Sequence, residues 1–384
     1  MTRILLGMLG SNGDCMYATA VARQLKVDFP GCHLTWAIAS LCRQVLTNNP
    51  DIDAVWEFPL ASWTDMEHAW TLLEIEARQQ AETGHFDHVF LVQISPGRFA
   101  DYDGTIRPSI FRGFGRPITV PVDVTVNLTE AERAGVDRWF QDSPAADASQ
   151  VVLCECSSKS GQSFMTVELG MQMAEAVVAE RARAVVILST HEALPRPHPR
   201  IISGASLSMR QTARLTDHVD LFVGCGSGLS VVATSGAARP ALPNIQILKR
   251  STSVYASFRH DFAHFGKPTG HFMELTSENP AHLSRAVITA LSDGFAAAQA
   301  EFDDPVPLTF DWYIEVITLN VLERGRYADA VQSLLVTANR FGWHPDLKRF
   351  ARTHILPFLN ADPRSTLPHR RAQQDQLRAA VAIA

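Results

Sequence analysis

The first residues whose side chains could take part in chemistry lie in a short loop near the start of the chain. Ser11, Asn12, Gly13 and Asp14 directly follow Ile4–Leu9, an apolar run that is typical of a buried strand. Ligands of open parallel sheets bind where strands end, and glycine lets the backbone approach them closely. Asp14 either faces such a ligand or caps the helix that begins here. The loop lacks the glycine spacing of a dinucleotide-binding motif, G-x-G-x-x-G.

A second glycine-rich loop stands between an apolar run and a helical pattern, at Gly224-Cys225-Gly226-Ser227-Gly228. Glycines ahead of a helix leave backbone N–H groups pointing outward at the positive end of the helix dipole, which suits a phosphate. A compact turn without a ligand is the alternative. A nucleophile elbow is excluded, because G-x-S-x-G around Ser227 would need glycine where Cys225 and Leu229 stand. We predict that Gly224, Gly226, Ser227 and Gly228 contact a phosphate-bearing ligand.

A third loop follows the apolar strand pattern Val151–Leu153. It contains Ser157, Ser158 and Lys159. Hydroxyl groups and an ammonium group at a strand end could hold and neutralise the oxygens of a diphosphate. An ordinary solvated loop explains the same residues equally well, so both interpretations stay open.

The histidines and cysteines do not form a metal-binding motif. His260 and His264 have the i, i+4 spacing of a helical metal pair, but no third ligand is evident, so we predict no metal site. The six cysteines lie in or beside apolar segments without the spacing of a disulfide framework. This favours buried, reduced thiols and a cytoplasmic protein.

The overall composition excludes several other classes of protein. Hydrophobic residues make up 46% of the 384 residues, enough for a sizeable core. A net charge of -6 argues against nucleic acid as the main partner, because phosphate binding normally requires a basic field. The apolar run Ile4–Leu9 is too short for a signal peptide or a membrane span. We therefore expect a soluble globular protein.

The elements that position the three loops alternate between short apolar runs and amphipathic stretches, and the pattern restarts at Val151. Such alternation predicts mostly parallel sheets that are covered by helices on both faces. Residues 95–125 are rich in Gly, Pro and Arg and look like loops. We expect one α/β domain over residues 1–145 and a second over residues 151–300, joined by a polar linker.

A helical tail is expected over residues 301–384. Its helical patterns cover Trp312–Glu323, Tyr327–Phe341 and Asp346–Ile355, and residues 323–331 are similar to the turn and helix start of a tetratricopeptide unit. One such unit is weak evidence for a solenoid, since solenoids need several repeats to bury a core. We therefore favour a packing or assembly appendage over a peptide-binding array.

Several of these segments together are similar to one known family. The stretch from Ile4 through Ser11–Asp14 to Phe29-Pro30 is similar to a strand, S-x-G-D loop and helix ending in F-P, and Asn49–Asp53 to an N-P-x-I-D segment. Residues 206–228 resemble a second-domain stretch that leads into a D-S-G-x-x-H motif. This is the pattern of the heptosyltransferases of lipopolysaccharide synthesis, glycosyltransferase family 9. The resemblance covers roughly residues 3–245.

The resemblance implies the GT-B fold, in which two Rossmann-like domains face each other across a cleft. The second domain would hold a nucleotide-sugar donor, and an acceptor would approach the first domain along Ser11, Asn12 and Gly13. The resemblance also implies that Asp14 is the general base. The chain departs from the family at two positions, with Gly226 in place of its aspartate and Val231 in place of its histidine.

The predicted activity is an inverting, metal-independent transfer of a sugar to a glycan, lipid-linked or protein acceptor, without a cofactor. Asp14 would accept the proton of the acceptor hydroxyl group, while Ser158, Lys159 and the amides of Gly226, Ser227 and Gly228 would stabilise the leaving diphosphate. Two alternatives on the same fold are a non-catalytic nucleotide-sugar-binding or assembly subunit and an epimerase or hydrolase that needs no acceptor. Two further possibilities, peripheral association with the cytoplasmic membrane and formation of a homo-oligomer, stay open.

Overall fold

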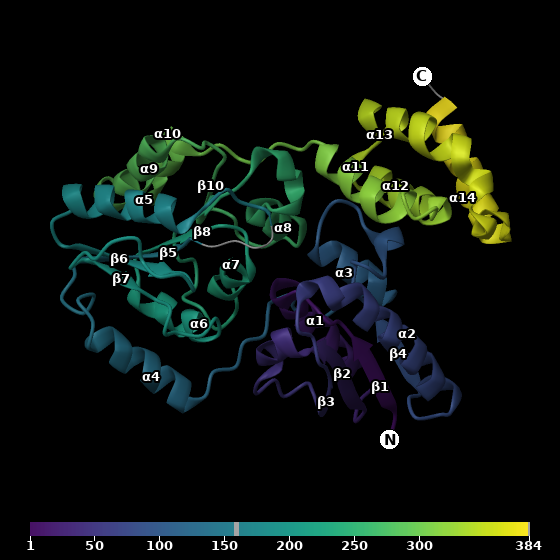
Figure 1. The fold of residues 1–384 in the computed structure, drawn as a ribbon, viewed down its shortest axis with the longest axis horizontal. Coiled ribbons are helices and arrows are strands. Elements are labelled where there is room, and N and C mark those ends of the chain that lie inside the picture. Colours follow the sequence, from purple (N-terminus) through teal and green to yellow (C-terminus); the bar gives the residue numbers. More distant parts are fainter. Residues whose placement is uncertain (157–160, 383–384) are drawn as a thin grey trace.

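Two α/β halves, each with a parallel sheet, and a tail of helices make up the molecule (Figure 1). The computed structural model describes residues 1–156 and 161–382. The first half contains a four-stranded sheet in the order β3-β2-β1-β4, with parallel pairs throughout. Its elements are β1 (Arg3–Gly7), α1 (Asn12–Asp28), β2 (His33–Ala39), β3 (Ala54–Phe58), α2 (Met66–Glu82), β4 (His88–Leu91) and α3 (Arg107–Phe114).

The second half contains a six-stranded parallel sheet in the order β10-β9-β8-β5-β6-β7. Separate apolar clusters cover its two faces, one under α5 and α9 and the other under α4 and α6. The elements are α4 (Glu130–Gln141), β5 (Gln150–Glu155), α5 (Val167–Glu180), β6 (Ala184–Ser189), β7 (Ile201–Ser203), α6 (Gln211–Leu215), β8 (Leu221–Gly224), α7 (Gly228–Ala233), β9 (Asn244–Ile247), α8 (Phe258–His264), β10 (Phe272–Leu275), α9 (Pro280–Ser292) and α10 (Phe295–Phe302).

The predicted α/β class with parallel sheets is confirmed. The strand expected at Val151–Leu153 lies within the observed Gln150–Glu155, and the helix expected at Tyr327–Phe341 has the observed bounds. The interpretation of residues 95–125 as loops is wrong in part, because α3 lies within them. Pro108 near the start of α3 and Gly115, with a left-handed φ of 74° just after its end, are helix start and stop signals rather than loop residues.

Helix α4 packs with the second sheet rather than the first. Glu132 pairs with Arg210 at 3.0 Å, and Asp137 pairs with Arg214 at 2.9 Å, in both cases reaching α6 or the turn before it. The chain therefore crosses between the halves before α4, as Figure 1 shows. We propose a domain boundary ahead of Glu130 instead of at residue 145.

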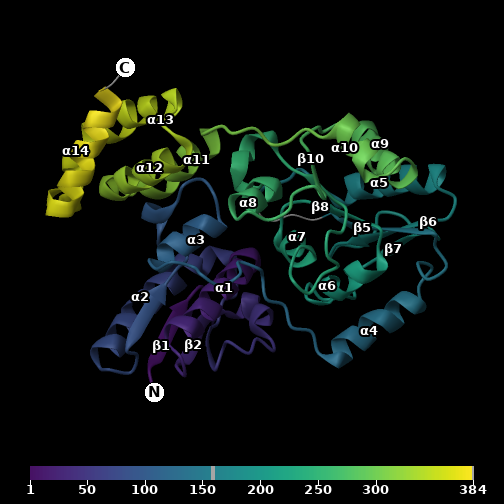
Figure 2. The same cartoon turned by 180° about the vertical axis from the view of Figure 1, so that it is seen from behind.

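The tail returns to the first half after leaving the second (Figures 1 and 2). The Ser333 hydroxyl donates to the Tyr102 carbonyl oxygen at 2.7 Å, and the Tyr102 and Tyr313 rings stack with centroids 6.0 Å apart. These contacts thus fix the helical tail to the loop before α3. The tail helices are α11 (Asp311–Ile317), α12 (Tyr327–Phe341), α13 (Pro345–Phe350) and α14 (Pro368–Ala382).

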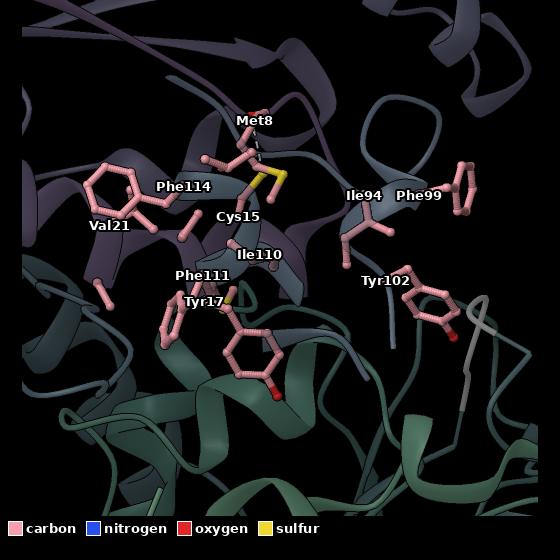
Figure 3. Packing of buried hydrophobic residues seen from close by; sticks show 14 of the residues in the cluster. Met8, Cys15, Tyr17, Val21, Ile94, Phe99, Tyr102, Ile110, Phe111 and Phe114 are labelled. Carbon is pink, nitrogen blue, oxygen red and sulfur yellow. Dashed lines mark hydrogen bonds between the residues drawn. The ribbon is translucent and has the colours of Figure 1, made fainter. Parts of the chain in front are cut away.

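A cluster of buried side chains beneath the first loop fixes the start of α1. Cys15 packs against residues of β1 and α3, and its thiol donates to the Met8 carbonyl oxygen at 3.6 Å (Figure 3). Tyr17 lies at the edge of this cluster, with its hydroxyl group toward the second half. All six cysteines are buried and free, as predicted. Within the described ranges, none of the helices combines the length and apolar character that crossing a bilayer requires.

Candidate functional site

A small cavity lies where the loop that begins α1 in the first half meets the glycine loop before α7 in the second half. Its volume is about 60 Å³, and its walls come from the first turn of α1, the start of α3, the loop before α7, and α8 with the turn before it. Ser11, Gly13 and Asp14 line it from the first half, and Gly226, Ser227 and Gly228 line it from the second. The two loops singled out in the sequence therefore meet at one site.

Asp14 is the acidic group that the first half presents to the cavity. The helix begins at Asn12 with Ser11 as the N-cap residue, so Asp14 belongs to the first helical turn. Burial raises the pKa of Asp14 from its ordinary value of 3.8 to about 7, although a hydrogen bond from the Ser11 backbone partly opposes this. Asp14 thus faces the cavity and also interacts with the start of the helix. The two interpretations of Asp14, as a ligand-facing residue and as a helix cap, are therefore compatible.

Contact between the two halves explains why glycine stands at positions 13 and 228. A Cβ atom on Gly228 would lie 3.3 Å from the Asn12 Cβ atom and 3.4 Å from the Gly13 backbone nitrogen. A Cβ atom on Gly13 would lie 3.7 Å from the Gly228 Cα atom. The absence of side chains at these positions lets the loops from the two halves pack directly against each other.

The glycine loop of the second half is held from behind by a buried acid that sequence analysis missed. Glu155, the last residue of β5, accepts hydrogen bonds from the Cys225 backbone N–H at 3.2 Å, the Ser230 hydroxyl at 2.7 Å and the Ser227 hydroxyl. Burial raises the pKa of the Glu155 carboxyl group, and these hydrogen bonds oppose the rise. A carboxylate at the end of an otherwise apolar strand was the available signal.

Two groups predicted to contact phosphate are already bonded within the protein. The Gly226 N–H donates to the Gln246 side chain at 3.1 Å, and the Ser227 hydroxyl donates to Glu155. Gly224 does not line the cavity; a Cβ atom there would lie 2.4 Å from both Gln246 Nε2 and Ser230 Oγ. A glycine is therefore required at position 224 because a larger residue would clash with these neighbours. The phosphate contacts predicted for Gly226 and Ser227 stay predictions, since both residues line the cavity, whereas Gly224 lies outside its lining.

A buried ion pair joins the halves beside the cavity. Arg107 of α3 pairs with Asp261 of α8 at 3.0 Å, and both line the cavity. The Arg107 guanidinium also lies over the Tyr17 ring, 4.3 Å from its centroid. Burial raises the pKa of Asp261, and Arg107 opposes the rise. These residues are far apart in the sequence and follow no motif, which is why sequence analysis did not connect them.

Two tyrosines make the surroundings of Asp14 poorly hydrated. Burial raises the pKa of Tyr17 and of Tyr255, and the nearby Asp14 carboxyl group raises both further. Both phenols therefore stay neutral at physiological pH. Val231, which stands where the family has histidine, adds an apolar wall. The cavity thus places the Asp14 and Asp261 carboxyl groups in a low-dielectric environment, which strengthens electrostatic interactions inside it.

The other residues singled out in the sequence are the third loop, Asn12 and the histidine pair. Ser157, Ser158 and Lys159 fall outside the described residues, and Asn12 does not line the cavity. The histidine pair lies on α8, where the Arg340 guanidinium is 3.1 Å from His260 Nε2. Burial and Arg340 lower the pKa of His260 to about 4. Among residues 1–156 and 161–382, no three His, Cys, Asp or Glu side chains are grouped as metal ligands.

The chain shares its fold with solved bacterial glycosyltransferases. A glycosyl transferase family 9 protein from Veillonella parvula superposes with a TM-score of 0.52 over 74% of this chain and 89% of its own, at 14% identity. The ADP-heptose lps heptosyltransferase II of E. coli superposes with a TM-score of 0.50 over 77% of this chain and 99% of its own, at 12% identity. No protein-family model and no curated protein matches the sequence. The likeness confirms the expected GT-B fold.

Proposed function

We propose that this chain is a glycosyltransferase that moves a sugar from a nucleotide-sugar donor to an acceptor hydroxyl group. The observation that carries the proposal is Asp14, a carboxyl group with a pKa of about 7 in the first turn of α1, in a cavity between the two halves. A general base works best when its pKa lies near the working pH. The fold, shared with a family 9 glycosyl transferase and a heptosyltransferase, supports the same class.

In the proposed reaction, ionised Asp14 accepts the proton of the acceptor hydroxyl group as that oxygen forms a bond to the anomeric carbon of the sugar. The bond between this carbon and the diphosphate oxygen breaks, and the nucleoside diphosphate leaves from the opposite face. This in-line displacement inverts the anomeric configuration. We further propose that no metal takes part, which dialysis against EDTA before the assay tests. The Gly228 backbone and Lys159 remain our candidates for stabilising the diphosphate.

The size of the cavity implies that the halves must separate to admit substrates. A volume of about 60 Å³ holds only a few water molecules, since one water needs about 10–15 Å³ of such space. The direct contact between Gly13 and Gly228 closes the site at this point. We propose that opening admits the donor and acceptor, and that closure excludes water, which would otherwise compete as acceptor.

Replacement of Asp14 tests the proposal. A thermal-shift screen against nucleotide-sugars identifies the donor first, since ligand at about 100 times its Kd adds roughly 2.7 kcal/mol of stability. With that donor, Asp14→Asn should lower the rate of sugar transfer by about 10²–10⁴-fold, because a positioned base contributes that much. Donor binding, measured by calorimetry, should stay within a few-fold of the parent. Transfer within about tenfold of the parent would remove Asp14 as the base.

A non-catalytic binder is the second candidate, and one observation favours it. Gly226 and Val231, which replace the aspartate and histidine of the family, both line the cavity. Glycine and valine have no polar side-chain atoms, so neither residue can supply the side-chain hydrogen bonds that an aspartate or a histidine would make to a donor. Tight binding of a nucleoside diphosphate, without transfer or hydrolysis of any nucleotide-sugar, would favour this candidate over the transferase.

A further inference from the structure

A second, larger hollow lies beneath the tail, outside the cavity described above. Its volume is about 480 Å³, and its walls come from α3, α8, α12 and α14. We call it the tail groove. It exists only because the tail returns to the first half, so two of its walls belong to the tail and two to the helices that carry Arg107 and Asp261 (Figure 1).

The tail groove opens close to the cavity. On α8, Asp261 lines the cavity and His264 lines the groove; on α3, Arg107 lines the cavity and Arg112 lines the groove. A helix rises 1.5 Å per residue, so these pairs are separated by about 4.5 Å and about 7.5 Å along their helix axes. A ligand a few sugar units long could therefore reach from one site to the other around these two helices.

The floor of the tail groove carries excess positive charge. Arg112 and Arg340 share one buried carboxylate, Asp103, at 2.6 and 2.7 Å. Both arginines and hydrogen bonds from Thr105 hold the pKa of Asp103 below its usual range despite its burial, so this group is ionised. Two guanidinium groups against one carboxylate leave one positive charge. The neighbouring Asp101 does not cancel it, since Asp101 pairs with Arg98 at 2.8 Å.

The rest of the groove wall is rich in side-chain amides. Its lining includes Gln332 and Asn339 of α12 and Gln373 and Gln376 of α14, beside the apolar Leu335 and Val336. An amide group donates and accepts hydrogen bonds, as a sugar hydroxyl group does, so the two match without a change of charge. Guanidinium groups are the preferred partners of carboxylate and phosphate groups. The lining therefore matches a polyhydroxylated ligand that also carries a negative charge.

We propose that the tail groove binds an anionic saccharide, the part of the acceptor that extends out of the cavity. Carboxylate or phosphate groups of this saccharide would contact Arg112 and Arg340, and its hydroxyl groups would contact the amides of α12 and α14. The identification of this ligand as the acceptor rests on the proposed function. Its binding to the groove does not, because binding requires neither the donor nor Asp14.

The test is isothermal titration of the full chain with four probes: trigalacturonate, maltotriose 6-phosphate, neutral maltotriose and inorganic phosphate. At least one of the two anionic saccharides should bind, more tightly than maltotriose and phosphate, and its affinity should fall as salt is raised. Asn339→Asp/Gln376→Glu places two negative charges in the groove and should weaken binding at least about tenfold, through like-charge repulsion.

The matched control is Arg371→Gln/Arg378→Gln, which changes the net charge of the chain by the same amount at exposed positions of α14 outside the groove lining. It should bind within about twofold of the parent if charge in the groove itself decides affinity. Gln376→Lys adds a positive charge and should tighten binding, which keeps the test valid even where the double variant folds poorly. Asp14→Asn should bind as the parent does, even where it has lost transfer.

Three results would overturn the proposal. The first is that neither anionic saccharide binds, although a nucleoside diphosphate does; this would leave the proposed function untouched. The second is that groove and control variants weaken binding equally. The third is that inorganic phosphate or a nucleic acid oligomer binds as tightly as the saccharides, which would make the groove a general anion site.

Discussion

At the scale of single residues, Asp14 carries both the proposed chemistry and a cost in stability. Its pKa of about 7 in the folded protein lies above the ordinary value of 3.8, so between these pH values the folded state binds more protons than the unfolded state. Stability should therefore fall as pH rises from about 4 to about 7. Above that window the folded protein holds a poorly solvated carboxylate.

Replacement of this carboxyl group should consequently stabilise the protein while it abolishes transfer. Asp14→Asn keeps a neutral side chain of similar shape, so its Tm should exceed that of the parent at pH 8 and exceed it by less at pH 5. Thermal unfolding at both pH values measures this. Asp14→Ala serves as a control for lost packing, since it should not gain the same amount at pH 8. A parent as stable as Asp14→Asn at pH 8 would contradict the raised pKa.

At the scale of elements, the glycine loop before α7 owes its shape to packing as much as to ligand binding. Gly226 has a φ of 69°, and a Cβ atom there would lie 2.8 Å from Gln162 Oε1 and 3.0 Å from Leu248 Cδ2. Glu155 and Gln246 hold the loop from behind through its backbone and hydroxyl groups. The loop is thus rigid before any donor arrives, which favours precise placement of a diphosphate.

Gly226→Ala should therefore destabilise the protein more than a glycine substitution that meets only backbone strain. Gly84 is the matched control, because its φ is 71° and nothing lies within 4 Å of a Cβ atom there. Gly84→Ala should cost about 1–2 kcal/mol from the left-handed backbone alone. Gly226→Ala should cost more and also weaken donor binding, as measured by urea unfolding and calorimetry. Equal losses of stability in the two variants would refute the packing argument.

At the scale of the whole molecule, the two halves are joined by groups that lie at the site itself. The Arg107–Asp261 pair is buried, with side chains 2% and 15% exposed, whereas the Arg214–Asp137 pair is 27% and 38% exposed. Removal of one partner from a buried pair leaves an uncompensated charge, which costs far more than loss of a surface pair. The buried pair is thus expected to stabilise the closed arrangement of the cavity.

Arg107→Met should lower the free energy of unfolding by about 3–5 kcal/mol, and Arg214→Met by less than about 1 kcal/mol. The double variant Arg107→Met/Asp261→Leu should recover much of the loss, because it removes the stranded carboxyl group as well. Urea unfolding of the three variants and the parent measures these differences. A double variant less stable than Arg107→Met would show that Asp261 has another essential partner.

Local pattern in the sequence determined the elements and the position of the first loop. Strand and helix periodicities are local properties, so they predicted parallel sheets, and they placed Asp14 in the loop after the first strand. A buried acid such as Glu155 was also detectable, as a carboxylate in an apolar strand, but its bonding partners Ser227 and Ser230 come from a different segment.

Tertiary structure alone decided which groups share the site. The order of the strands and the docking of the halves bring Arg107 and Asp261 beside Asp14, although more than 90 residues separate each from the next. The same docking explains Gly13 and Gly228 as a contact between loops. The return of the tail creates the groove under α12 and α14. Such contacts depend on long-range packing, which no local periodicity encodes.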